Sequence, residues 1–107
     1  MTDELLNRLT AILEQRKAAD PNSSYVASLY RDGIDRIRKK IGEEATETVI
    51  ALGGTDDEAI VHEVADLWFH CLVALVHRGI PPQQVIAELV RRVGRSGLEE
   101  KASRQRQ

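Results

Sequence analysis

The stretch IDRIRKKIGEEATETVIALGGTDDEAIVHEVADLWFHCLVALVHR, residues 34–78 of this 107-residue chain, decides the fold. Apolar residues recur at helical spacing on both sides of Gly53-Gly54, which predicts two long helices separated by a turn. Because that turn is tight, we expect the two helices to be antiparallel neighbours. Thr55 and Glu58 have the spacing of a capping box, with Thr55 as the N-cap of the second helix.

Shorter amphipathic segments lie on both sides of this central pair. Two proline-containing stretches, residues 20–24 and 81–82, interrupt the helical pattern. No segment alternates like a strand, so we predict an all-α fold, an antiparallel bundle of four to five helices. Residues 1–94 are expected to form one helical domain, and residues 95–107 its basic tail. The expected helices cover residues 3–19, 25–31, 34–52 and 55–78 and a last segment marked by Val85, Ile86, Leu89, Val90 and Val93.

Composition and charge narrow the class of protein. Apolar residues make up 42 % of the chain and charged residues 30 %, which is typical of a soluble globular protein. The net charge of −2 argues against nucleic acid as a partner of the whole surface. The single cysteine, Cys71, excludes an internal disulfide and a cysteine-based zinc site. No uninterrupted apolar run approaches the ~18 residues of a membrane span and no signal peptide is recognisable, so we expect a cytoplasmic protein without membrane contact.

The helix expected over residues 55–78 has an apolar stripe that is wide for a single chain. Val61, Trp68 and Leu72 extend this stripe over much of the helix circumference. A helical monomer of this size buries only about 60–65 % of the surface of its unfolded chain. We therefore expect a second copy of the chain to complete the bundle as a homodimer.

Two pairs of acidic residues repeat one i, i+3 spacing on the central helices. Glu44 and Glu47 precede the glycine turn, and Glu63 and Asp66 follow it at a matching distance, so an antiparallel arrangement places both pairs at one level. Carboxylates about 5 Å apart repel by about 3 kcal/mol at an effective dielectric of about 20. The side chains must therefore splay into water, change protonation or hold cations, and an all-oxygen site suits Mg²⁺ or Mn²⁺. Each pair taken alone is more typical of a solvated helix face.

Neighbouring polar residues allow more than one interpretation. Lys40 precedes Glu44 by one turn, and we expect it both to reduce the carboxylate repulsion and to contact a phosphate. His70 follows Asp66 by four residues and is interpreted as a metal ligand, a hydrogen-bond partner of a ligand, or a buried structural histidine. Cys71 is predicted to be a small apolar core side chain. The histidines expected at the surface, away from the acidic pairs, are His62 and His77.

The acidic pattern resembles that of a known superfamily. Glu44-x-x-Glu47 followed by Glu63-x-x-Asp66 is similar to the motif of the all-α nucleoside-triphosphate pyrophosphohydrolases, the MazG-like superfamily. The resemblance implies that these four carboxylates bind Mg²⁺, for which Mn²⁺ is an expected substitute. It also implies that the reaction is hydrolysis of a phosphoanhydride.

Three further stretches narrow the resemblance to one family. SYVASL (residues 24–29), KKIGEEATE (39–47) and SGLEEKASR (96–104) are similar to the phosphoribosyl-ATP pyrophosphatases, and the likeness covers roughly residues 5–104. It implies a Mg²⁺-dependent diphosphatase that converts phosphoribosyl-ATP to phosphoribosyl-AMP and pyrophosphate, the second step of histidine biosynthesis. The implied catalytic residues are Glu44, Glu47, Lys40 and Glu43, the last as a candidate base. The implied substrate-binding residues are Lys40, Ser24, Tyr25, Lys101 and Arg104.

Alternatives to this function stay open from the sequence. A related enzyme would hydrolyse other nucleoside or deoxynucleoside triphosphates with the same carboxylates. A helical interaction module without catalysis would present the acids as a solvated face. The basic tail has two interpretations as well, either a solvated end of the chain or an arm that brings cations to a polyphosphate.

Overall fold

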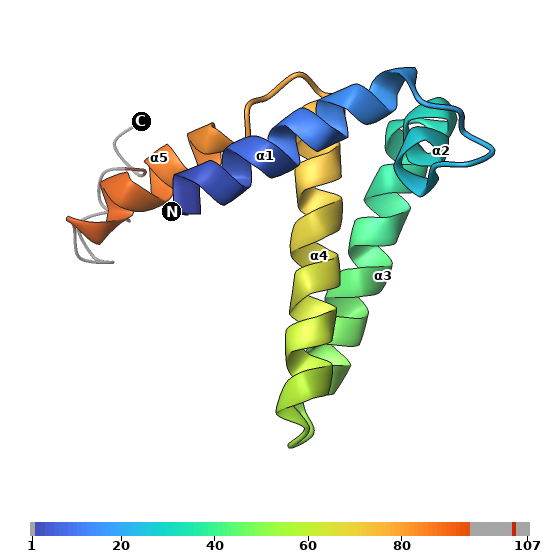
Figure 1. Cartoon of the computed structure of the whole chain (residues 1–107). Helices are drawn as coiled ribbons and strands as arrows, with labels where there is room; N and C mark the ends of the chain where they lie inside the picture. The colour runs from blue at the N-terminus through green and yellow to red at the C-terminus, as the bar shows by residue number, and fades with distance from the viewer. Residues whose placement is uncertain (1, 95–103, 105–107) are drawn as a thin grey trace.

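The computed structural model describes residues 2–94 and residue 104. This part of the chain consists of five α-helices and one 3₁₀ turn. In chain order these are α1 (Thr2–Gln15), η1 (Arg16–Ala18), α2 (Tyr25–Asp32), α3 (Ile34–Leu52), α4 (Asp57–His77) and α5 (Gln83–Val93). Helices α3 and α4 form an antiparallel hairpin, and α1 crosses the open end of that hairpin (Figure 1). The described residues contain no strand, which confirms the predicted fold class.

Local hydrogen bonds set the limits of α2. The Ser24 side chain accepts from the N–H of Ala27 at 3.1 Å and caps the first turn. At the other end, Gly33 adopts a φ of +91°, a conformation that favours glycine, and its N–H donates to the carbonyl of Leu29 at 2.9 Å. The chain therefore changes direction sharply between α2 and α3, as the glycine predicts. The first helix ends at Gln15 and continues only as η1, so its predicted extension to residue 19 is too long.

The start of α4 corrects one prediction. Asp56, and not Thr55, is the N-cap, because Asp56 Oδ1 accepts from the N–H groups of Glu58 and Ala59 at 3.1 and 3.3 Å. Aspartate and threonine are both favourable N-caps, so the residue pattern alone does not separate them. The predicted capping box, which placed Thr55 at the cap, is therefore wrong by one residue.

Gly79 ends α4, close to the predicted limit at residue 78. The N–H of Gly79 donates to the carbonyl of Val76 at 3.0 Å, and that of Ile80 donates to the carbonyl of Leu75 at 2.9 Å. This pair of bonds is the Schellman arrangement, which requires a left-handed residue after the helix, and Gly79 has a φ of +73°. This stop ends α4 and turns the chain toward α5.

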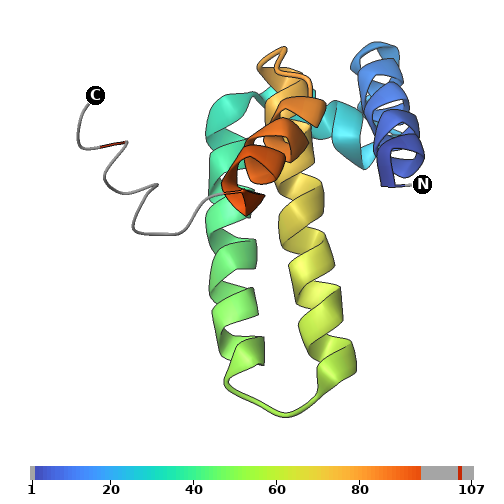
Figure 2. The ribbon, with the colours of Figure 1, turned by 90° about the vertical axis from the view of Figure 1, so that its left-hand side faces the viewer.

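The buried core lies at the open end of the hairpin. Ile37 of α3 and Val73 and Val76 of α4 are buried there against Leu13 of α1 and Leu29 of α2. Burial of these aliphatic side chains is the main force that holds α1 and α2 to the hairpin. The core therefore supports the hairpin at one end, while the end with the glycine turn extends away from it (Figure 2).

Several large apolar side chains outside that core are exposed in the part of the chain that the structure describes. Val49 and Ile50 of α3 and Val61 and Trp68 of α4 are between 67 and 71 % exposed. Trp68 also borders an apolar groove of about 430 Å³ between α1, α4 and α5. Cys71 lines the same groove and is half-buried rather than a full core residue, and this burial raises the pKa of its thiol. This uncovered surface is what the homodimer prediction requires.

Helix α4 also qualifies the expectation about membranes. By length and composition alone it could cross a bilayer, since an 18-residue window has a mean hydropathy of 1.6, and only 17 % of that window is buried inside the protein. Counting uninterrupted apolar residues had excluded such a span, and that exclusion was too strict. One helix of this kind is weak evidence, because apolar helices that pack against protein have the same composition.

Candidate functional site

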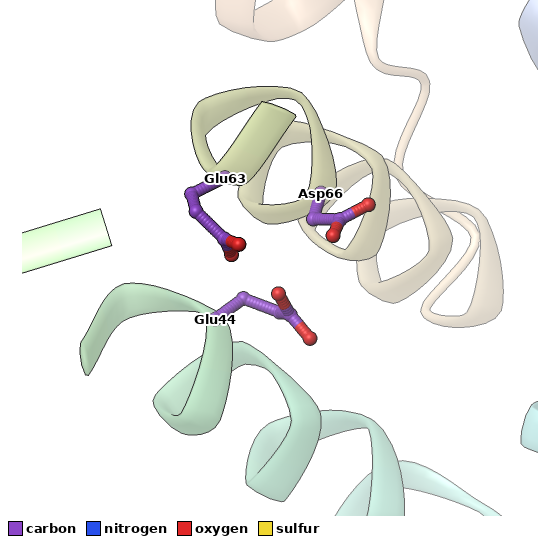
Figure 3. A group of neighbouring side chains, drawn as sticks. All are labelled: Glu44, Glu63 and Asp66. Atoms are coloured by element: carbon purple, nitrogen blue, oxygen red, sulfur yellow. The ribbon is translucent and has the colours of Figure 1, made fainter. Parts of the chain in front are cut away.

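Three carboxylates from the two helices of the hairpin meet at one level. Glu44 projects from α3, and Glu63 and Asp66 project from α4 toward it (Figure 3). One carboxylate oxygen from each residue lies within 4.8 Å of the others. The predicted antiparallel arrangement, counted from the glycine turn, thus brings together three of the four predicted acids.

A threonine fixes the two helices to each other at this level. The Thr48 hydroxyl donates to the carbonyl of Glu44 at 2.8 Å and also lies 3.2 Å from the carbonyl of Glu63, so its proton is shared between the two helices. Thr48 is buried, where such a bond is not exchanged with water. The sequence analysis did not single out Thr48, although its spacing of four residues from Glu44 places both on one helix face.

The cluster leaves two buried oxygens without hydrogen bonds. Glu44 is only 6 % exposed, and among residues 2–94 and 104 neither its Oε2 nor Oε2 of Glu63 has a hydrogen-bond partner. A buried carboxylate oxygen without a partner is destabilising by several kcal/mol unless a cation neutralises it. The donor set consists of oxygens only, which is the ligand type that Mg²⁺ and Mn²⁺ prefer. The residues present therefore fit a hard divalent cation.

Glu47 does not join this group. Its side chain is exposed and is not among the carboxylates within 4.8 Å of one another. The difference from Glu44 follows from the rotation of α3, because the side facing α4 carries Ile37, Glu44 and Thr48, all buried. Glu44 thus faces α4 and Glu47 does not, so the two glutamates that were predicted to act as one pair have different surroundings.

Lys40 lies where the sequence analysis expects it. Its Nζ is 3.5 Å from Glu44 Oε1 and 3.5 Å from Glu43 Oε2. Burial acts to lower the pKa of Lys40, but Tyr25 and the two glutamates outweigh that effect and leave the pKa raised. Lys40 is therefore a permanent cation at the edge of the cluster. Glu43 is largely exposed and contacts the cluster only through this lysine.

His62 was predicted to lie away from the acids, and the structure contradicts this. Its Nε2 is 3.3 Å from Asp66 Oδ2, one helical turn further along α4. The imidazole is exposed, as predicted, but its length lets it reach the carboxylate at the i+4 position. His77 is half-buried and stacks on Tyr30 with the ring planes 11° apart, so it is not a free surface residue either.

His70 is buried and connects α4 to α2. Its Nδ1 is 2.8 Å from the carbonyl oxygen of Asp66, and its Nε2 is 2.8 Å from the Tyr25 hydroxyl. A carbonyl only accepts, so Nδ1 carries a proton; in the neutral ring Nε2 then accepts from the Tyr25 hydroxyl. His70 thus connects the backbone of Asp66 to Tyr25. It is both a hydrogen-bond partner of Asp66 and a buried structural histidine, two of the three interpretations made from the sequence.

The remaining predicted substrate residues lie around this bond. Tyr25 has a half-exposed ring, with the guanidinium carbon of Arg36 at 5.8 Å from its centroid. Ser24 caps α2, as described above. Of the two predicted tail residues, Arg104 is exposed and Lys101 lies outside the described residues, as does most of the predicted tail.

These features define a helical protein with an acidic centre of the cation-binding type. The family described as phosphoribosyl-ATP pyrophosphohydrolase matches residues 6–93, and the chain belongs to this family. A protein of Methylococcus capsulatus named phosphoribosyl-ATP pyrophosphatase is 60 % identical over 101 residues, which cover 94 % of this chain and 96 % of the relative. Two further relatives have the same name. The protein of Methylibium petroleiphilum is 57 % identical over 95 % of this chain and 85 % of the relative. The protein of Burkholderia mallei is 56 % identical over 98 % of this chain and 89 % of the relative. The resemblance found in the sequence is thereby confirmed.

Proposed function

We propose that this chain hydrolyses phosphoribosyl-ATP to phosphoribosyl-AMP and pyrophosphate, the step of histidine biosynthesis for which its relatives are named. Membership of the family over residues 6–93 supports this activity. The observation that carries the proposal is the carboxylate cluster of Glu44, Glu63 and Asp66 inside a hairpin of this family. A hydrolase acting on a triphosphate needs positive charge beside the phosphates, and this cluster is suited to hold it.

We further propose that the cluster binds Mg²⁺, with Mn²⁺ as a substitute. Glu44, Glu63 and Asp66 would hold the ion, and the unpartnered Oε2 atoms of Glu44 and Glu63 support that assignment. Glu47 is proposed as a fourth ligand, since an exposed glutamate one turn away can change rotamer toward the ion. The bound ion would supply charge that stabilises the oxygens of the departing pyrophosphate.

The residues around the cluster have separate tasks in this mechanism. A water molecule attacks the phosphorus in line with the leaving group, and the bond to the pyrophosphate oxygen breaks. A carboxylate accepts the proton of the water, and we assign this step to Glu43 or to a glutamate of the cluster. Lys40 contacts the phosphates from the edge of the cluster, where its charge is secured by Glu44. Substrate contacts by Ser24, Tyr25, Lys101 and Arg104 belong to the same proposal.

The direct test is pyrophosphate release from phosphoribosyl-ATP, compared with release from the common deoxynucleoside triphosphates at the same Mg²⁺ concentration. We expect phosphoribosyl-ATP to react faster, and Glu44→Gln to lower turnover by about a hundredfold or more. Glu58→Gln, an exposed change on α4 outside the cluster, is the matched control. Faster turnover of deoxynucleoside triphosphates would assign the related enzyme instead. Hydrolysis of neither substrate would favour an interaction module.

We also propose that the protein is a cytoplasmic homodimer. The exposed Val49, Ile50 and Val61 on the free half of the hairpin support this arrangement, since a second hairpin would complete a four-helix bundle there. Trp68, which is exposed beside the groove between α1, α4 and α5, extends the same uncovered surface. The same burial by a second chain accounts for the membrane-like composition of α4. No nucleic-acid or membrane partner is included in the proposal.

A further inference from the structure

An open cavity, separate from the acidic cluster, lies between η1, the start of α2, and α4. Its volume is about 430 Å³, within the range of small-molecule pockets. Arg16, Ser23 and Ser24 line it from one side, and Tyr25 and Phe69 supply aromatic walls. Nothing in the catalytic arrangement described above uses Arg16 or Phe69.

The cavity is joined to the cluster through two neighbouring contacts. Tyr25 lines the cavity with its ring and bonds His70 through its hydroxyl, and His70 in turn holds the carbonyl of Asp66. Phe69 lines the same cavity and packs edge-on against His70, with 5.6 Å between the ring centroids. Because Phe69 lies three residues after Asp66, the cavity and the cluster are lined by neighbouring turns of α4. A nucleotide held at the cluster by its phosphates would extend into it.

The charge in the cavity comes from an arginine without an ion-pair partner. Within residues 2–94, Arg16 makes no salt bridge, whereas its neighbour Lys17 pairs with Glu14 at 3.3 Å. Arg36, on the other side of Tyr25, is paired with Asp32. The Ser24 hydroxyl accepts from Ala27, and its own proton stays available for an acceptor. The Ser23 hydroxyl already donates to the carbonyl of Asp20 at 3.3 Å, so the donors that face a ligand are the Arg16 guanidinium and the Ser24 hydroxyl, a set suited to bind a phosphate.

Phosphoribosyl-ATP differs from ATP by one group, a second ribose that carries its own phosphate. An enzyme that distinguishes the two must contact that group, because only contacts made to one substrate and not to the other separate them. We propose that this cavity is the subsite for the phosphoribosyl end of the substrate, with Arg16 binding its monophosphate and Tyr25 and Phe69 flanking the base between the two ends. Arg16 is then a specificity-determining residue, distinct from the groups that act on the reacting phosphorus.

The test compares the binding of two products, phosphoribosyl-AMP and AMP, because both lack the pyrophosphate. This inference rests on the proposed reaction, but product binding can be measured by calorimetry without turnover. We expect the wild-type protein to bind phosphoribosyl-AMP more tightly than AMP. Arg16→Ala should weaken phosphoribosyl-AMP binding about tenfold and leave AMP binding unchanged, as expected for the loss of one charge-assisted contact. Arg16→Lys should keep part of the preference.

Lys17→Ala is the matched control, since Lys17 is a neighbouring cation that does not line the cavity. It should bind both products like the wild type, and circular dichroism should show the same helix content in all variants. Equal loss of both products in Arg16→Ala, an unchanged preference in that variant, or no preference in the wild type would each overturn the inference. Failure of the proposed reaction would be seen separately, as the absence of pyrophosphate release by the wild-type protein.

Discussion

Replacing Glu63 by glutamine tests whether the acidic cluster is a cation site. Carboxylate oxygens of Glu44, Glu63 and Asp66 lie within 4.8 Å of each other, so each charged pair repels by about 3.5 kcal/mol at an effective dielectric of about 20. Lys40 beside Glu44 and the partial exposure of Asp66 reduce this repulsion. We therefore expect Glu63→Gln to raise the free energy of unfolding of the metal-free protein by about 1–2 kcal/mol.

The amide introduced by Glu63→Gln stabilises the metal-free protein in a second way. Its N–H₂ group can donate to the Oε2 of Glu44, which otherwise has no hydrogen-bond partner. For a domain of this size, 1 kcal/mol corresponds to about 4–8 °C in Tm, so the metal-free variant should melt about 5–15 °C above the wild type. The wild-type protein should gain about 2.7 kcal/mol at a Mg²⁺ concentration of about 100 times Kd, and the variant much less.

Thermal unfolding followed by circular dichroism, at one protein concentration with chelator and with Mg²⁺, measures both effects. The sign of the substitution should reverse between the two conditions. Glu58→Gln, the same chemical change at an exposed position of α4, should leave the Mg²⁺ effect intact. A metal-free Glu63→Gln protein that melts below the wild type and still gains stability from Mg²⁺ would refute the reasoning, because the carboxylate would then neither repel its neighbours nor hold the ion.

Three further predictions concern the N-cap of α4, the half-buried Tyr30 and the exposed Trp68. Asp56→Ala should lower the free energy of unfolding by about 1 kcal/mol in urea titrations, and Thr55→Ala should change it little, because Asp56 alone caps α4. Burial and the charge of Glu14 raise the pKa of Tyr30 to about 12. An absorbance titration of Tyr25→Phe should show this value, and the stability that Tyr30 contributes should decline as the pH rises from about 10 to about 12, since the folded state holds the proton more tightly. Trp68→Glu should shift sedimentation toward a monomer, whereas Trp68→Phe should not.

The hairpin was predictable because short-range rules decide it. Gly53-Gly54 stops one helix, Gly79 stops the next, and the spacing from the turn sets the level at which Glu44 meets Glu63. Each of these steps depends on neighbours a few residues apart, which helical periodicity describes well. The superfamily resemblance rests on acids of this hairpin, whereas the narrower family resemblance also uses residues 24–29 and 96–104 outside it.

The predictions that were wrong depend on side-chain contacts and on the rotation of a helix about its axis. The angle between Glu44 and Glu47 is only about 60°, yet one is buried on the seam and the other is exposed, because packing against α4 sets the rotation of α3. His62 lies four residues before Asp66, a spacing that makes the two residues neighbours on the helix surface, and their contact follows from it. The cavity beside Arg16 brings together two segments about 50 residues apart in the chain, which no local pattern indicates.

The acidic cluster lies between the packed core and the free half of the hairpin, and this position affects how it can bind a cation. Moving along α3, Ile37 is buried in the core, Glu44 lies at the cluster, and Val49 is exposed on the free half of the hairpin. The cluster thus lies between a packed end, which fixes its geometry, and an end that a second chain would cover. Burial next to the core makes the unpaired oxygen of Glu44 destabilising, and that same burial excludes the water that would otherwise compete with a cation. Site and core are therefore coupled, and a core substitution such as Ile37→Ala should weaken Mg²⁺ binding as well as stability.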